Sequence, residues 1–317
     1  MKNSSSLINK WRFPKALVLA LILLPIALII LILTVSQDVL LAGHVIYEKE
    51  SLYHYISVVD NKSVRALQFR KGPGANEQSA INLNNPDEHV LEYTKMIFAS
   101  LAFVPRPEHI LVVGLGGGII PTTLRKHYPD AQIDIVELDN DVFEVAQKFF
   151  DFRNSELTKT FIADGRVYVR QARDSGKRYD IIILDAFNGT YIPPHLTTKE
   201  FLQEVFELLN DNGCIASNVH NNNKLYGYQQ RTYANVAPQS YIFEGKNNAI
   251  IVSTRQRTKK TRQEIKDSIF QLQGLHGFSF NLETVGELLI KKPTWPTQGE
   301  ILTDNFSPVN ILKSKKM

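Results

Sequence analysis

The chain has 317 residues, a formal net charge of +4, 44% hydrophobic residues and 21% charged residues. This composition is ordinary for a globular protein and excludes wholesale disorder, and no basic stripe interleaved with aromatic residues points to nucleic acid as a partner. The single cysteine, Cys214, excludes an intrachain disulfide and a cysteine-based metal site, and the eight histidines are scattered, so the sequence predicts no metal centre.

The first predicted element is a transmembrane helix. Residues 16–35 form a run of 20 residues without a charge, and a helix of that length covers about 30 Å, the thickness of the hydrocarbon core of a bilayer. The apolar region of a secretory signal peptide is shorter, about 7–15 residues, and no convincing small-x-small cleavage site follows the run. A retained single-pass anchor is therefore favoured over a cleaved signal peptide or a buried soluble helix.

The flanks of this span favour one orientation. The basic segment 1–15 carries four cationic side chains, whereas Asp38 follows the span and the first lysine after it is Lys49. The positive-inside rule then places residues 1–15 in the cytoplasm and the rest of the chain on the far side of the membrane.

The next predicted unit is a small antiparallel β domain over residues 44–83. Apolar and polar side chains alternate there, and DNKS supplies a turn between two strands. The following segment, PDEHVLEYTKMIFASLAFV, is predicted to be a helix, with Pro86, Asp87 and Glu88 in its first turn.

From His109 onward, strands alternate with helices, which predicts a parallel sheet covered on both faces. The last two strands, SYIFEG and AIIVSTR, are separated by KNN and predict a hairpin, so that the final strand runs antiparallel to the others. This arrangement is typical of the Rossmann-like S-adenosylmethionine methyltransferase class and not of dinucleotide dehydrogenases. The predicted fold class is therefore α/β, with a nucleoside-binding domain over residues 86–258 and a C-terminal helix and tail over residues 259–317.

The sequence GLGGGIIP follows the first of these strands and predicts a turn that approaches a nucleotide. A dinucleotide fingerprint has a glycine at its sixth position, where this chain has Ile119. The glycines stand instead at Gly114, Gly116, Gly117 and Gly118. They suit a broad turn beside a bulky uncharged part of a ligand, such as the sulfonium and ribose of S-adenosylmethionine. A purely structural tight turn is the alternative.

Two carboxylates at strand ends strengthen the prediction of an adenosyl site. Glu137 ends the second strand, about 20 residues after the turn, where an acid can accept both ribose hydroxyls. Asp164, followed by Gly165, ends the third predicted strand, where a carboxylate can reach the exocyclic amine of adenine. Each acid taken alone is more often solvated or a helix cap, but with the turn they predict a site for an adenosyl sulfonium.

Six segments together resemble the spermidine/spermine synthase family of aminopropyltransferases: DEHVLEYTKM, ILVVGLGGG, DIVELDNDVFEVAQKFF, ADGRVYVRQ, YDIIILDAF and LTDNFSPVN. The chain is most similar to divergent, membrane-linked bacterial members, which share DAF and IPPHLTT. The resemblance covers about residues 44–312. It implies a small β domain, a Rossmann-like domain, frequently a homodimer, and an anchor in a bacterial inner membrane. It also implies decarboxylated S-adenosylmethionine as aminopropyl donor, an amine as acceptor and no permanently bound cofactor.

The chemistry of aminopropyl transfer indicates which residues matter. An alkyl amine, with a pKa near that of lysine at about 10, is mostly protonated at neutral pH, so the site needs a carboxylate that accepts its proton. In the family this acid lies in an Asp-x-x-Asp loop. Asp185 matches its first position as the catalytic residue, whereas the second position is Asn188, which removes a charge from the diamine pocket. The alternative is that Asp185 only organises the loop.

The resemblance assigns further residues to the site. Gln78 matches a glutamine near the nucleoside, and Asp87 is implied as an acidic contact of the substrate. Glu92 and Tyr93 stand where typical members have Tyr-His-Glu, and Ile119 stands where they have an Asp that recognises the donor's amine. We therefore expect an intact nucleoside pocket and an eroded diamine pocket.

The leading hypothesis is a membrane-anchored, spermidine synthase-like transferase that acts on a small amine. The second is S-adenosylmethionine-dependent methyl transfer to an unknown acceptor, and the third is a non-catalytic binding protein on the same fold. Adenosyl donors are cytosolic, whereas the flanks of residues 16–35 favour export of the domain, so the sequence leaves the side of the membrane open.

Overall fold

The computed structural model describes residues 43–69, 77–187, 189, 191–290 and 299–308. Almost all of them belong to one compact unit, Val45–Met317. Within these described ranges no helix is long and apolar enough to cross a membrane. The predicted span over residues 16–35 lies outside the described residues and stays a prediction.

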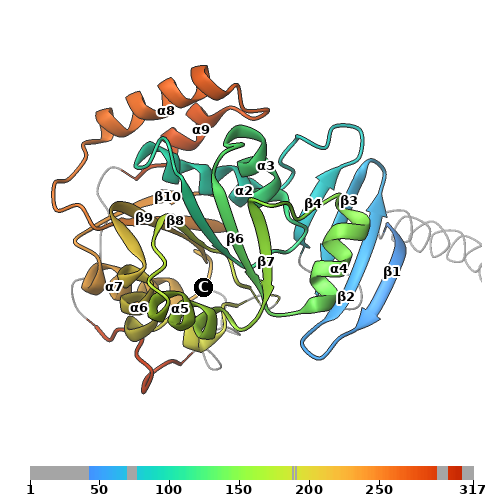
Figure 1. The fold of residues 1–317 in the computed structure, drawn as a ribbon, viewed down its shortest axis with the longest axis horizontal. Coiled ribbons are helices and arrows are strands. Elements are labelled where there is room, and N and C mark those ends of the chain that lie inside the picture. Colours follow the sequence, from blue (N-terminus) through green and yellow to red (C-terminus); the bar gives the residue numbers. More distant parts are fainter. Residues whose placement is uncertain (1–42, 70–76, 188, 190, 291–298, 309–317) are drawn as a thin grey trace, which may run out of the picture. The chain divides into compact units, whose positions relative to one another are not determined.

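Two sheets organise the described chain (Figure 1). The first is antiparallel, with the order β1-β2-β3-β4, and consists of β1 His44–Glu50, β2 Tyr55–Asn61, β3 Val64–Gln68 and β4 Glu77–Asn82. The second has seven strands in the order β10-β11-β9-β8-β5-β6-β7: β5 His109–Val113, β6 Gln132–Glu137, β7 Thr158–Ile162, β8 Tyr179–Leu184, β9 Leu209–His220, β10 Gln239–Glu244 and β11 Asn248–Thr254. The predicted N-terminal β sheet and Rossmann-like sheet are confirmed, whereas the domain boundaries stay predictions.

The strand directions bring the strand ends together at one edge. Strands β7, β6, β5, β8 and β9 run parallel, whereas β11 pairs antiparallel with β9 and β10 pairs antiparallel with β11. This confirms the predicted C-terminal hairpin. Because the carboxyl ends of the parallel strands lie at the same edge, the residues that follow them converge there.

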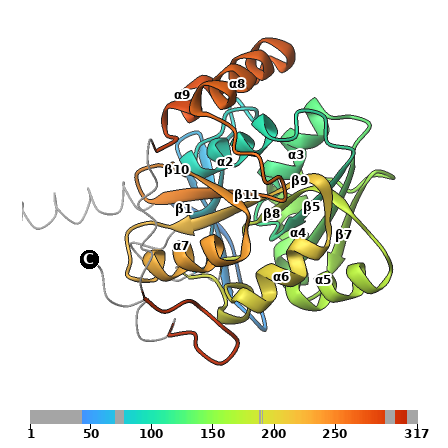
Figure 2. The same cartoon turned by 90° about the vertical axis from the view of Figure 1, so that its left-hand side faces the viewer.

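Helices cover both faces of the seven-stranded sheet (Figure 2). Apolar side chains of one sheet face pack against α2 Glu92–Met96, the 3-10 helix η1 Ile97–Ala102, α3 Ile119–His127, α4 Asn140–Phe149, α8 Arg262–His276 and α9 Leu282–Glu287. Those of the other face pack against α5 Gly165–Asp174, the 3-10 helix η2 Pro194–Leu196, α6 Lys199–Glu207 and α7 Leu225–Val236. The burial of both faces explains why the strands are almost continuously apolar.

The small sheet packs against the first turns of α3 and α4. Ile56, Val58 and Leu67 of the small sheet share a buried cluster with Ile119 of α3 and Val142 of α4. Since α3 and α4 begin at the carboxyl edge of the parallel strands, this packing places the small sheet beside that edge.

The helix predicted from Pro86 begins only at Glu92, so this boundary was wrong. His89 lies between Pro86 and Glu92 in the sequence. Its side chain is buried, and its backbone forms an antiparallel bridge with Ile81 of β4. Its Nδ1 lies 2.9 Å from the Thr94 hydroxyl. A backbone that pairs with a strand cannot join a helix at the same residue, so the segment from Pro86 forms a turn.

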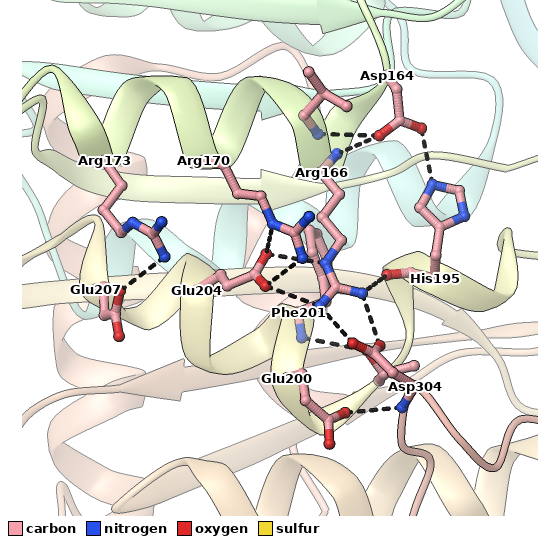
Figure 3. Close-up of polar contacts among 12 residues, drawn as sticks. Asp164, Arg166, Arg170, Arg173, His195, Glu200, Phe201, Glu204, Glu207 and Asp304 are labelled. Atoms are coloured by element: carbon pink, nitrogen blue, oxygen red, sulfur yellow. Dashed lines mark hydrogen bonds and ion pairs between the residues drawn. The ribbon is translucent and has the colours of Figure 1, made fainter.

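A buried arginine fastens residues 299–308 to the face formed by α5 and α6 (Figure 3). Arg166 donates two hydrogen bonds to Glu204, at 2.9 and 2.8 Å, and two to Asp304, at 2.7 and 2.8 Å. The Thr198 hydroxyl, which also caps α6, donates to Asp304 at 2.7 Å. Arg166 therefore holds the motif LTDNFSP in place through Asp304, the acid of this motif.

We predict that Arg166→Leu destabilises the protein by about 2–3 kcal/mol. Removing one partner of a buried ion pair costs about 3–5 kcal/mol; here Asp304 is 41% exposed and Arg170 still neutralises Glu204, which lowers the cost. The matched control is Arg173→Leu in the same helix, where a partly exposed arginine pairs with exposed acids and little or no change is expected. Urea unfolding measures both, and equal losses would contradict the assignment.

Candidate active site

A cavity of about 510 Å³ opens at the carboxyl edge of the parallel strands. Its volume is that of a small-molecule site. Five carboxylates line it, and no lysine or arginine is among its lining residues in the described part of the chain: the acids are Glu77, Glu92, Glu137, Asp164 and Asp185. A low-dielectric cleft lined by one sign of charge concentrates counterions, so this cavity favours cationic ligands.

The glycine turn lies between β5 and α3, next to the end of β8. Gly114 has a φ of +100°, and a Cβ at this position would collide with the carbonyl oxygen of Asp185. Gly114 and Gly116 line the cavity. Gly118 does not: it precedes α3 with a φ of +77°, and a Cβ there would lie 2.7 Å from the Phe152 ring. The prediction of Gly118 as a ligand contact is corrected to a packing role.

Glu137 lies at the end of β6 and is 7% exposed. Its Oε2 accepts the Leu115 N–H at 3.0 Å and its Oε1 accepts the Asp139 N–H at 2.9 Å. Burial raises the pKa of Glu137, although both backbone hydrogen bonds oppose this shift. Each carboxylate oxygen has a second lone pair, which leaves two acceptor positions for a ribose diol.

Three lining residues from the small β domain escaped prediction: His54, Phe69 and Glu77. The Nδ1 of His54 lies 3.1 Å from Oδ2 of Asp139, and its ring stacks on Phe69 with centroids 4.0 Å apart. Ser51 also hydrogen-bonds to Asp139. Because Asp139 is 85 residues away in the sequence, no local pattern pointed to His54.

Asp164 caps a helix at the predicted adenine end. Strand β7 ends at Ile162, so Asp164 does not end it as predicted; its Oδ1 accepts the N–H groups of Arg166 and Val167 at 2.9 and 3.0 Å. Its Oδ2 lies 2.8 Å from Nε2 of His195 (Figure 3). Burial acts against ionisation, but these hydrogen bonds lower the pKa of Asp164. Because His195 uses one lone pair of Oδ2, the other remains to accept a hydrogen bond from an adenine amine.

Asp185 directly follows β8 and lines the cavity. Its Oδ1 accepts the Nδ2 of Asn218 at 2.8 Å. Burial raises the pKa of Asp185 to about 7, although the hydrogen bond from Asn218 lowers it. The neighbouring Tyr93 hydroxyl donates to the Gln78 carbonyl oxygen at 2.8 Å. A carboxyl group with a pKa near neutrality is suited to general base catalysis.

Three more of the predicted contacts line the cavity: Gln78, Glu92 and Gly165. The Gln78 amide donates to the Gly189 carbonyl oxygen at 3.1 Å, and the Glu92 carboxylate accepts the backbone N–H of Lys246 at 2.9 Å.

Asp87 is outside the cavity wall, because the turn before α2 directs its carboxylate to Lys126 of α3 at 2.5 Å. Its prediction as a substrate contact is corrected to a surface ion pair. Asn188 lies outside the described residues. Among the described residues no group of acidic, histidine or cysteine side chains could hold a metal ion.

Comparisons with known proteins agree with this geometry. A model of the spermine/spermidine synthase domain matches residues 90–244. A polyamine aminopropyltransferase from Vibrio vulnificus (strain CMCP6) is 36% identical over 275 residues, which are 85% of this chain and 91% of the relative.

Two solved structures share the fold. A probable spermidine synthase from Corynebacterium glutamicum ATCC 13032 has a TM-score of 0.62 at 18% identity, over 82% of this chain and 97% of the other. Human methyltransferase-like protein 13 in complex with SAH has a TM-score of 0.55 at 28% identity, over 59% and 93%. The first likeness concerns the fold alone.

We predict that Glu137→Gln weakens the binding of methylthioadenosine about 10- to 100-fold. Because glutamine keeps only one acceptor oxygen, the variant loses one hydrogen bond between a ribose hydroxyl and a charged acceptor, worth about 1.5–3 kcal/mol. Isothermal titration calorimetry measures the change. The control is Glu144→Gln, an exposed acid of α4, which should bind like the native protein; equal affinities for all three proteins would exclude Glu137 from the ribose site.

Proposed function

The chain belongs to the spermine/spermidine synthase family and is an aminopropyltransferase that takes decarboxylated S-adenosylmethionine as co-substrate, and from this premise we propose that Asp185 is its catalytic base. A small amine is the acceptor. The roles of the individual residues and the membrane anchor are proposals, supported by the geometry of the cavity and by the sequence.

The charge of the cavity is the observation that carries this assignment. Decarboxylated S-adenosylmethionine is a dication, with a sulfonium and a primary ammonium, and its acceptor is also a cation. Five carboxylates and, among the described residues, no lysine or arginine line the cavity, which suits two cationic substrates. S-adenosylmethionine itself carries an α-carboxylate, for which the described residues of the cavity wall offer no lysine or arginine.

The proposed step is a displacement at carbon. Glu137 holds the ribose and Asp164 the adenine, so that the sulfonium lies near Asp185. The acceptor nitrogen attacks the aminopropyl carbon that is bonded to the sulfonium sulfur. A nitrogen–carbon bond forms while the bond between this carbon and sulfur breaks. Sulfur leaves as the neutral thioether of methylthioadenosine, and the proton of the acceptor nitrogen passes to the Asp185 carboxylate. Asn218 orients that carboxylate.

Methyl transfer remains the second candidate because of the likeness to human methyltransferase-like protein 13. We predict that the full chain, incubated with putrescine and other amines, forms methylthioadenosine and an acceptor enlarged by an aminopropyl group from the decarboxylated donor. With S-adenosylmethionine we expect no methylated product, because the described residues of the cavity wall include no lysine or arginine for its carboxylate. Mass spectrometry distinguishes the products, and methylated amine with no aminopropyl product would overturn the proposal.

We predict that kcat/KM for the acceptor rises with pH and levels off above about pH 7, because Asp185 must be ionised to accept a proton and its pKa is about 7. Asp185→Asn should lower kcat by about 10²- to 10⁴-fold and abolish this dependence. Asp211→Asn removes an exposed acid of β9 and serves as the control with a native profile. A native-like rate for Asp185→Asn would reject the proposed base.

We also propose that residues 16–35 anchor the enzyme in a membrane. The support is the uncharged run of 20 residues, long enough for one helical span. The full chain should remain in the membrane fraction after an alkaline carbonate wash, whereas a fragment that starts at residue 39 should be released. Release of the full chain by the same wash would contradict the anchor.

A further inference from the structure

The cavity wall behind Asp185 is made of side-chain amides. Asn218 lies near the end of β9 and Asn248 begins β11, two strands that pair antiparallel. On the same sheet face, the next residues of these two rows belong to the hydrophobic core: Ala216 and Cys214 in β9, and Ile250 and Val252 in β11. The two amides therefore stand where this apolar stretch ends, at the edge where Asp185 lies.

The two amides form a hydrogen-bonded chain with one direction. The Nδ2 of Asn248 donates to Oδ1 of Asn218 at 2.8 Å, and the Nδ2 of Asn218 donates to Oδ1 of Asp185 at 2.8 Å. Asn218 is 2% exposed, so water cannot readily replace either partner. Because an amide has one acceptor end and one donor end, a donor on the Asn218 carbonyl turns its NH₂ group toward Asp185.

We propose that Asn248 is a positioning residue for the reaction: through Asn218 it keeps an N–H donor on the Asp185 carboxyl and thereby holds this base ionised and oriented toward the acceptor amine. The inference rests on the proposed role of Asp185 as the base.

Reversal of the Asn218 amide would change the charge state of Asp185. The Asn218 carbonyl would then face the carboxyl group, and only the protonated acid could donate to it. Burial already raises the pKa of Asp185 to about 7, and a hydrogen bond that favours the neutral form raises it further. At neutral pH most of the base would then be protonated and inactive.

The other titratable groups in this part of the cavity do not replace the amide chain. Burial raises the pKa of Tyr93 and lowers that of His220, so both are neutral at pH 7. Glu92 of α2 is held by the backbone N–H of Lys246 at 2.9 Å. Asn218 therefore supplies the side-chain hydrogen bond that favours the ionised form of Asp185.

Three variants of Asn248 test the direction of the chain. Asn248→Leu removes the donor without adding charge, Asn248→Asp replaces the donor with acceptors and forces the reversal, and Asn248→Gln retains an N–H donor. We expect the acidic limb of the kcat/KM profile to move upward by about one pH unit in the first two, more for Asn248→Asp, and to stay near the native position in Asn248→Gln. Activity at high pH should recover.

A titration of the Asp185 carboxyl carbon by ¹³C NMR, assigned with Asp185→Asn, separates this inference from the proposed reaction. If the resonance shifts upward in Asn248→Leu and Asn248→Asp but no aminopropyl transfer occurs, the role of the amide chain is supported and the proposed function is rejected. If the resonance titrates at the native pH in all three variants, or if activity falls equally at every pH, the proposed role of Asn248 is wrong. Circular dichroism melting identifies any variant that does not fold, and Asn248→Gln then keeps the comparison with the native protein.

Discussion

Desolvation of carboxylates, with no lysine or arginine among the described residues of the cavity wall, is the constraint on which this site depends. Glu137 accepts backbone N–H groups, Asp164 accepts the N–H groups at the start of α5 and pairs with His195, and Asp185 accepts the Asn218 amide. These partners keep the acids in place, and no described lysine or arginine of the wall neutralises them. Cationic substrates supply the missing charge, so the cavity is matched to a sulfonium donor and an amine acceptor.

The scaffold holds these acids through contacts that are distant in the sequence. Asp164 caps α5 and also receives His195, which fixes the segment after β8. Two residues further along the chain, Arg166 bonds Glu204 and Asp304 and fastens the C-terminal segment to the same helix (Figure 3). The beginning of α5 therefore joins the nucleoside end of the cavity to the outer layer. On the other side, Asp139 caps α4 and binds Ser51 and His54 of the small sheet, which makes that sheet part of the cavity wall.

Local patterns predicted the parts of the molecule that depend on local structure. Strand ends placed Glu137 and Asp185 at one edge, and the short KNN turn predicted the antiparallel hairpin. The errors arose where a distant contact decides the local structure. The backbone of His89 pairs with β4, so α2 begins only at Glu92. Asp87 therefore lies in a turn and contacts Lys126 instead of the cavity. His54 and the Asn218–Asn248 chain escaped prediction because their partners come from other strands or from the other sheet.

The central claim is that the cavity holds an adenosyl donor along the strand ends and presents the acceptor amine to Asp185. A crystal structure of the protein with methylthioadenosine and putrescine tests it directly. We predict ribose hydroxyls on Glu137 and one putrescine nitrogen within hydrogen-bond distance, about 3 Å, of the Asp185 carboxylate. A nucleoside bound away from Glu137, or a putrescine with neither nitrogen near Asp185, would contradict the account.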